Sequence, residues 1–272
     1  MDTIWTGAAR FNRTESHLLR HLMAKLTRDG QHPQALFITC ADSRIVPSDI
    51  TGTGPGDLFT MRNIGNLVPA YDGSVGKAMT PSDLEPSMGA ALAYAIEVLE
   101  IPSIIVCGHS ECGAMKAVAS GDLSQADLHL QVWLTHAAES ARRLEAGEAP
   151  DPTLPRHDQL AQINALQQAG NLVAYPVVER ALRERRLQIH AWYFDLARAE
   201  VQVYEQDRNR FVRLEESVSP AGEALPPGAS FAVEWHIPRH TEVSLEAGGR
   251  ERETERSALS LSSTAKGEDR CA

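Results

Sequence analysis

The stretch "SIIVCGHSEC", residues 103–112, decides the fold. Its first six residues are apolar or small and follow Pro102, a pattern typical of a short buried strand. Upstream, Pro86 can open a helix in which Met88, Leu92 and Ile96 recur at helical spacing. A buried strand that follows an amphipathic helix is the repeating unit of an α/β protein.

The same alternation continues on both sides of this stretch. Residues 8–28 have the apolar spacing of an amphipathic helix, and two or three helices are expected between residues 112 and 186, with a break around "GEAPDPTLP". Four more segments are predicted strands: "QALFITC" (34–40), "DLFTMRN" (57–63), "LQIHAWYFD" (187–195) and "EVQVYEQ" (200–206). The last two can form a hairpin. We therefore expect an α/β fold: a mostly parallel central sheet with an antiparallel edge, flanked by helices.

Composition excludes several classes of protein. The 272 residues are 43% hydrophobic and 23% charged, as in ordinary globular proteins. The net charge of −10 argues against a nucleic-acid partner, which would require a concentrated basic surface. No apolar run approaches the roughly 20 residues of a membrane helix, so no membrane association is expected. The N-terminus has no secretory pattern, which favours the cytoplasm.

The sequence changes character after about residue 206. We predict a main domain over residues 1–206, a C-terminal extension over 207–245 and a disordered tail over 246–272, where charged and small residues dominate. Within the extension, "FAVEWHI" (231–237) could add one more strand or pack on the main domain.

Three potential metal ligands follow two of the predicted strands. Cys40 ends one strand, and His109 and Cys112 follow another. The carboxyl ends of parallel strands lie together, so these side chains should converge. Three Cys and His ligands suit a catalytic Zn²⁺, which keeps a fourth position for water. Taken alone, each residue has a structural interpretation, because strand-end cysteines are often buried hydrophobes. Cys107 is expected to be such a core residue.

Asp42 and Arg44 follow Cys40 in "CADSR". At a spacing of two residues, their side chains can lie on the same side of an extended segment. An exposed ion pair contributes little to stability. Beside a metal, however, the carboxylate could accept a hydrogen bond from bound water or bind the metal itself, with Arg44 holding it ionised and oriented.

These paired motifs, "CADSR" and "GHSECGAM", closely resemble those of the β-class carbonic anhydrases. The resemblance runs from about residue 8 to residue 205 and includes "PGDLFTMRNIGNLVP" and "GNLVAYPVV". It implies that Cys40, His109 and Cys112 bind one Zn²⁺ per subunit and that Asp42 and Arg44 form a catalytic dyad. It also implies carbon dioxide and bicarbonate as substrates, and a homodimer in which the N-terminal helix arm packs on the partner subunit. Dimers of this family often pair further into tetramers.

Position by position, the chain matches the plant-type branch of that family. The resemblance places Gln31 where that branch binds bicarbonate through a glutamine, and Gly113 where a backbone amide faces the substrate. It also places Phe59, Ile64 and Tyr94 in an apolar substrate pocket. Each also has an ordinary interpretation, as a turn residue for Gln31 and as core residues for the three apolar side chains.

The other branch binds bicarbonate as an inhibitor through a tryptophan, an arginine and a tyrosine. The corresponding positions here are Phe37, Arg62 and Gly170, so two of the three residues are missing. The resemblance therefore predicts no bicarbonate lock.

Three other interpretations of the motifs remain open. A carbon disulfide or carbonyl sulfide hydrolase could use the same zinc ligands on the same scaffold. A non-catalytic zinc-binding protein is a second alternative, although a structural site is usually closed by a fourth Cys or His. A redox thiol pair is disfavoured, because the candidate ligands follow a Cys–His–Cys pattern without C-x-x-C spacing.

Overall fold

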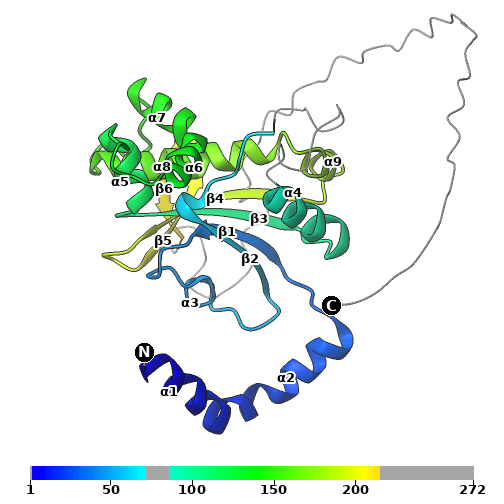
Figure 1. Cartoon of the computed structure of the whole chain (residues 1–272). Helices are drawn as coiled ribbons and strands as arrows, with labels where there is room; N and C mark the ends of the chain where they lie inside the picture. The colour runs from blue at the N-terminus through cyan, green and yellow to red at the C-terminus, as the bar shows by residue number, and fades with distance from the viewer. Residues whose placement is uncertain (1, 72–85, 215–272) are drawn as a thin grey trace, which may run out of the picture. The chain divides into compact units, whose positions relative to one another are not determined.

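The computed structural model describes residues 2–71 and 86–214. Its centre is a six-stranded sheet in the order β2-β1-β3-β4-β5-β6 (Figure 1). The strands are β1 (Ala35–Cys40), β2 (Leu58–Asn63), β3 (Ser103–His109), β4 (Gln188–Asp195), β5 (Glu200–Glu205) and β6 (Arg210–Arg213). The first four are mutually parallel, and β5 and β6 are antiparallel additions. The predicted mostly parallel sheet with an antiparallel edge is confirmed.

The helices also follow the predicted alternation, but they are more numerous between residues 112 and 186 than expected. Here five helices form where two or three were predicted, and the predicted break falls between α7 and α8. The described helices are α1 (Asp2–Arg10), α2 (Ser16–Asp29), α3 (Pro47–Thr51), α4 (Pro86–Ala93), α5 (Gly113–Ser120), α6 (Leu128–Leu134), α7 (Ala138–Glu145), α8 (Arg156–Leu172) and α9 (Pro176–Arg183).

The core lies mainly on one face of the sheet. Alternate residues of β1 (Leu36, Ile38 and Cys40) face this core, which α4, α5, α8 and α9 complete. A smaller cluster on the other face contains Phe37, which packs edge-on against Trp192 at a ring-centroid distance of 5.9 Å. This alternation is the normal period of a strand, and it sends Cys40 and Phe37 to opposite faces.

Gly108 explains why α8 can pack closely on β3. A Cβ atom at this position would lie 2.9 Å from the carbonyl oxygen of Ala161 in α8, closer than real Cβ contacts allow. The absence of a side chain therefore lets the helix approach the strand immediately before the site residue His109.

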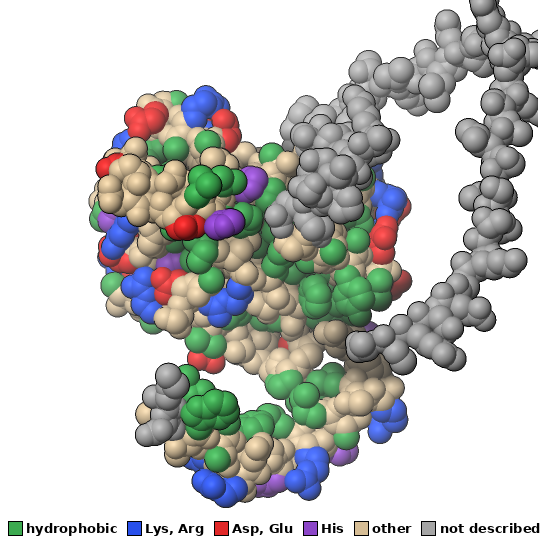
Figure 2. Space-filling view, in the orientation of Figure 1, with side chains coloured by type: hydrophobic (Ala, Val, Ile, Leu, Met, Phe, Trp, Pro, Cys, Tyr) green, Lys and Arg blue, Asp and Glu red, His purple; other side chains and the backbone are tan. Residues whose placement is uncertain are grey.

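The N-terminal helices form an arm with an unusual number of exposed apolar side chains. Helix α1 continues into α2 through a π-helical turn at Phe11–Glu15, so the helix starts earlier than the predicted residue 8. Ile4, Trp5 and Leu18 are 77%, 72% and 72% exposed. Figure 2 shows hydrophobic side chains along one edge of the arm and basic ones along the other. Such an apolar stripe is typical of an interaction surface.

Strand β6 is the one strand of the described sheet that the sequence did not predict. Arg210–Arg213 pairs with β5, and only Phe211 and Val212 are buried. Two apolar residues between two arginines are too short a run for a strand pattern. The predicted strand at 231–237 and the predicted disordered tail lie outside the described residues. No helix in the described part of the chain is long and apolar enough to cross a bilayer.

Candidate metal centre

The three predicted ligands converge at the carboxyl ends of two neighbouring strands. Cys40 is the last residue of β1 and His109 the last residue of β3, which pairs with β1 in parallel. Cys112 directly precedes α5. The ligand atoms of these three buried residues all lie within 4.8 Å of one another. The sheet topology therefore brings together residues that are far apart in sequence.

A sharp turn at Glu111 returns the chain from His109 to Cys112. Glu111 has a φ of 57°, a left-handed conformation that costs a non-glycine residue on the order of 1–3 kcal/mol. Hydrogen bonds hold it on both sides. Its N–H donates to Oδ1 of the buried Asp158 at 2.7 Å, and its carbonyl accepts from Arg44 Nη2 at 3.2 Å. The surroundings thus impose the backbone conformation that positions Cys112.

His109 is oriented as a metal ligand. Its Nδ1 lies 2.8 Å from the carbonyl oxygen of Ser110, which can only accept, so the ring proton is assigned to Nδ1. Nε2 is fully buried and has no hydrogen-bond partner among the described residues. Buried polar atoms are rarely left unpaired, and a metal ligand is a common explanation. The donor set and the orphan Nε2 therefore fit a metal ion.

The two cysteine thiols shift each other's pKa in opposite directions. The pKa of Cys40 is lowered, mainly because the Cys112 thiol donates a hydrogen bond to the Cys40 thiolate, with a smaller contribution from the Gly65 amide. The same contact raises the pKa of Cys112, because its ionisation would place a second thiolate beside the first. A bound cation would favour both thiolates together. In contrast, burial raises the pKa of Cys107 to about 12, as expected for a core thiol.

Asp42 and Arg44 form the close pair that their spacing predicted. Arg44 Nε donates to Oδ1 of Asp42 at 2.9 Å and Nη2 donates to Oδ2 at 2.7 Å. This bidentate contact with the guanidinium holds the pKa of Asp42 well below its usual range. Oδ2 of Asp42 also lies 3.9 Å from Nε2 of His109. An ionised, oriented carboxylate therefore stands beside the three ligands.

Arg62, in the neighbouring strand β2, forms hydrogen bonds with the backbone of residues 40–42. Its Nε donates to the carbonyl oxygen of Cys40 at 3.1 Å, and its Nη2 donates to that of Asp42 at 2.7 Å. In the sequence Arg62 stood out only as a bicarbonate-lock position. No local pattern predicts a side chain that bonds to backbone carbonyls of another strand.

Four of the five predicted substrate-binding residues are exposed in the single chain, and Phe59 is half-buried. Phe59 and Tyr94 pack against each other at a ring-centroid distance of 5.8 Å. Ile64 and Tyr94 are 45% and 46% exposed, which is unusual for residues of an apolar pocket. Gln31, between α2 and β1, and Gly113, at the start of α5, are exposed as well. If these residues line a pocket, groups other than the described residues must help to close it.

Glu111 belongs to a second, solvent-facing group of charged side chains. Its carboxylate pairs with Lys116 and, through Oε1 at 3.0 Å, with Nε2 of His157. Lys116 and His157 lower the pKa of Glu111 to about 2. These side chains already satisfy one another, so the group is explained as an ion-pair network at the rim of the centre.

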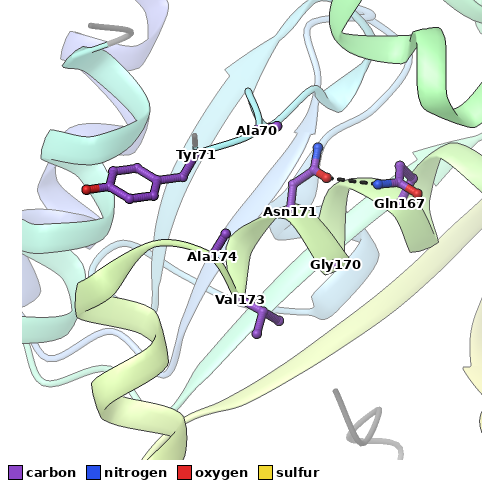
Figure 3. A pocket seen from close by; sticks show the side chains of 7 residues that line it. All are labelled: Ala70, Tyr71, Gln167, Gly170, Asn171, Val173 and Ala174. Carbon is purple, nitrogen blue, oxygen red and sulfur yellow. Dashed lines mark hydrogen bonds between the residues drawn. The ribbon is translucent and has the colours of Figure 1, made fainter. Parts of the chain in front are cut away.

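The three bicarbonate-lock positions have separate environments. Phe37 packs on Trp192, and Arg62 bonds to backbone carbonyls. Gly170 lies in α8 at the wall of a cavity of about 360 Å³ (Figure 3). The other residues that line this cavity are Ala70, Tyr71, Gln167, Asn171, Val173 and Ala174, and none of them is a predicted metal ligand. The absence of the lock stays a prediction.

Comparison with known proteins places these residues in a family. The carbonic anhydrase family model matches residues 35–201, which contain all three predicted ligands and the Asp42–Arg44 pair. The chain belongs to the β-class carbonic anhydrase family. A carbonic anhydrase of Pseudomonas aeruginosa is 36% identical over 232 residues, covering 85% of this chain and all of that protein. One from Synechocystis is 34% identical over 256 residues, covering 93% of this chain and 87% of that protein.

Solved structures of β-carbonic anhydrases agree with the fold. The β-carbonic anhydrase CcaA superposes with a TM-score of 0.68 at 34% identity, covering 78% of this chain and 91% of that one. A β-carbonic anhydrase of Sordaria macrospora, described as tetrameric, gives a TM-score of 0.57 at 29% identity, covering 74% and 92%. The family resemblance and the fold inferred from the sequence are therefore confirmed.

Proposed function

We propose that this β-class carbonic anhydrase catalyses the reversible hydration of carbon dioxide to bicarbonate and a proton, with one Zn²⁺ held by Cys40, His109 and Cys112. The observation that carries the proposal is the buried Cys–His–Cys group with its orphan His109 Nε2, directly beside an ionised Asp42. When bound, zinc lowers the pKa of a coordinated water toward about 7, a value known from a carbonic anhydrase with three histidine ligands, and so supplies a nucleophile near neutral pH.

The Asp42–Arg44 dyad would orient the reacting oxygen. Both oxygens of Asp42 accept hydrogen bonds from Arg44, so the carboxylate stays ionised and can act only as an acceptor. At this position the Asp42 carboxylate would accept a hydrogen bond from the attacking hydroxyl group. That bond would orient the hydroxyl so that a lone pair on its oxygen points toward carbon dioxide. Arg62 and Arg44 together bond to the backbone on both sides of the dyad, which keeps the acceptor in place.

The substrate pocket requires a second subunit in this proposal. Phe59, Ile64 and Tyr94 would form its apolar wall, while Gln31 and the Gly113 amide would bind bicarbonate. Ile64 and Tyr94 are about half exposed, and the N-terminal arm carries an unpartnered apolar stripe. A homodimer in which the arm packs on the partner subunit accounts for both observations. Pairing of two dimers is a further step of the same proposal.

The cellular compartment and the domain boundaries of the chain remain predictions. The cytoplasm stays the compartment that we propose. The main domain over residues 1–206, the extension over 207–245 and the tail over 246–272 also remain predictions. Strand β6 carries the sheet a few residues beyond 206, up to Arg213.

A direct comparison of substrates tests the proposed activity. Carbon dioxide hydration and the hydrolysis of carbon disulfide and carbonyl sulfide are measured on one zinc-loaded preparation of the full chain. We expect rapid hydration of carbon dioxide and negligible release of sulfide. Dominant sulfide release would assign the same centre to a hydrolase, and inactivity in every assay despite stoichiometric zinc would favour a non-catalytic zinc protein.

A further inference from the structure

One peptide group connects Trp133 to the Cys40 sulfur. The indole Nε1 of Trp133, in α6, donates to the carbonyl oxygen of Ile64 at 2.8 Å. The amide N–H of Gly65 donates to Sγ of Cys40 at 3.4 Å. The Ile64 carbonyl and the Gly65 amide belong to the same planar peptide unit. Two hydrogen bonds in series therefore run from the tryptophan ring to a candidate metal ligand.

Such a series has an electronic consequence. A donor at the carbonyl end of a peptide polarises the group and makes its N–H a stronger donor, because hydrogen bonds in chains reinforce one another. An N–H that donates to a thiolate takes up part of its negative charge and leaves less for a bound metal. Contacts of this kind around a ligand tune the metal and orient the ligand.

The position of Gly65 depends on its backbone conformation. Its φ of 78° and ψ of 17° lie in the left-handed region that favours glycine. A Cβ atom here would also lie 3.1 Å from the Cβ of Ala114. Any other residue would therefore strain the turn that presents this amide to Cys40.

Asn164 fixes the other side of Gly65. Its Nδ2 donates to the Gly65 carbonyl oxygen at 3.0 Å, and its side chain is fully buried. The amide cannot turn around freely, because its Oδ1 accepts from Ser140 Oγ and from Gln168 Nε2, each at 3.0 Å. The Gly65 carbonyl is thus held by a side chain whose own orientation is fixed by two donors.

The same helix holds the rest of the loop. Gln168, one turn after Asn164, accepts the Val68 N–H at 2.8 Å. Asn171 donates to the Val68 carbonyl at 2.8 Å, and the Tyr175 hydroxyl, beyond the end of α8, donates to the Pro69 carbonyl at 2.8 Å. This series of side chains holds the loop 65–69 as a unit, and only Asn164 contacts Gly65 itself.

We propose that Trp133 and Asn164 are positioning residues that hold the Ile64–Gly65 peptide against Cys40 and thereby set how strongly the Cys40 thiolate donates charge to the bound metal. This inference rests on the proposed metal at Cys40. It goes beyond the ligand set, because neither residue is a candidate ligand or a member of the dyad, and Trp133 acts from α6, which contributes none of the candidate ligands.

The test uses the full chain with cobalt in place of zinc, because thiolate-to-cobalt charge-transfer absorption reports the donor strength of the sulfur. Trp133→Phe keeps an aromatic ring and removes the N–H. In the cobalt form of this variant we expect the charge-transfer band to lie at lower energy than in the wild type. In its zinc form we expect kcat/KM for carbon dioxide hydration to fall about tenfold. Trp192→Phe is the matched control, because Trp192 packs on Phe37 on the opposite face of β1, and its band should not move.

A second pair of variants separates positioning from stability. Asn164→Ala and Asn171→Ala remove equal side chains from the same helix, but only Asn164 contacts Gly65. Both should lower the melting temperature, and only Asn164→Ala should shift the cobalt band. A folded, cobalt-loaded Trp133→Phe or Asn164→Ala with the wild-type band would overturn the inference. A wild-type spectrum without any thiolate band would instead overturn the metal assignment, and the inference with it.

One measurement needs no substitution. In wild-type protein loaded with a magnetically active cadmium isotope, the Gly65 amide proton should show scalar coupling to the metal through Cys40 Sγ. Absence of that coupling, with cadmium bound to both cysteines, would mean that the N–H···S contact does not exist and would also overturn the inference.

Discussion

Arg44 occupies both carboxylate oxygens of Asp42, at 2.9 and 2.7 Å, while Oδ2 of the same carboxylate lies 3.9 Å from the buried Nε2 of His109. The carboxylate is therefore held by Arg44 and presented to the candidate metal ligands at the same time. This relationship is the basis of the proposed dyad. It links the proposed role of Asp42 to the conformation of residues 42–44, which Arg62 also holds.

Asp42→Asn should retain the metal and lose most of the activity. The amide keeps the shape of the side chain, but its NH₂ group would face Arg44 or the reacting hydroxyl as a donor. We expect kcat/KM for carbon dioxide to fall by at least about 100-fold, in the range of a lost acid–base group, with zinc content unchanged. Glu139→Gln is the control, since Glu139 forms a similar bidentate pair with Arg142 on the surface of α7. A fully active, zinc-loaded Asp42→Asn would show that the dyad has another role.

Cys40→Ser and Cys107→Ala should differ completely in metal content. Both cysteines are buried in neighbouring strands, but only Cys40 lies in the Cys–His–Cys group. Cys40→Ser should purify with far less than one zinc per chain and show no hydration activity. Cys107→Ala should keep stoichiometric zinc and lose only some stability, on the order of 1 kcal/mol for a small core truncation. Elemental analysis of both variants checks this, and equal zinc in the two would refute the ligand assignment.

The Glu111 network should give a pH-dependent contribution to stability. Lys116 and His157 lower the pKa of Glu111 from 4.5 to about 2 in the folded chain. A lowered pKa means that the ionised form favours folding, so the contribution is present above about pH 4.5 and is lost as the pH falls toward 2. Glu111→Gln should therefore lower the melting temperature by at most about 3 °C at neutral pH, as for an exposed ion pair.

The difference between wild type and Glu111→Gln should shrink when the melts are repeated below pH 4.5. Lys116→Met removes the main cause of the lowered pKa of Glu111. It should also lower the melting temperature at neutral pH, and its difference from the wild type should also shrink below pH 4.5. A difference that grew on acidification would have the wrong sign for an ionised Glu111 and would exclude the explanation.

Charged substitutions in the N-terminal arm should dissociate the proposed dimer. Leu18 and Leu22 lie one turn apart in α2 and are exposed in the single chain. The double variant Leu18→Asp, Leu22→Asp should sediment as a monomer and lose activity, because the pocket side chains Ile64 and Tyr94 would stay open. Arg20→Asp, on the opposite side of the same helix, should remain dimeric and active. A monomeric wild type that hydrates carbon dioxide rapidly would contradict the shared pocket.

The sequence predicted the parts of this centre that local patterns encode. Cys40, His109 and Cys112 follow apolar runs, so strand periodicity alone placed them at the same edge of the sheet. Asp42 and Arg44 were paired by their spacing. Strand β6 was missed because two buried residues between arginines give no strand pattern. Five helices in place of two or three reflect turns within 112–186 that carry weak sequence signals.

The residues that hold the site could not be predicted in the same way. Arg62, Asp158 and Asn164 act through hydrogen bonds to backbone groups that lie distant in sequence. Such contacts are set by tertiary packing and leave no periodic trace. Gly65 gave one usable signal, because a glycine just after a strand often marks a left-handed turn. Its bond to Cys40 still required the three-dimensional structure.

We propose that zinc at Cys40, His109 and Cys112 makes this chain a carbon dioxide hydratase. The most direct test measures zinc content and hydration rate on the same samples, before chelation, after chelation and after zinc is restored, between about pH 6 and 9. We predict one zinc per chain, loss of activity with the metal and recovery with it, and a rate that rises on the alkaline side of neutrality because two thiolates donate strongly to the metal. Activity that persists in the zinc-free protein, or a fully zinc-loaded chain that does not hydrate carbon dioxide, would contradict it.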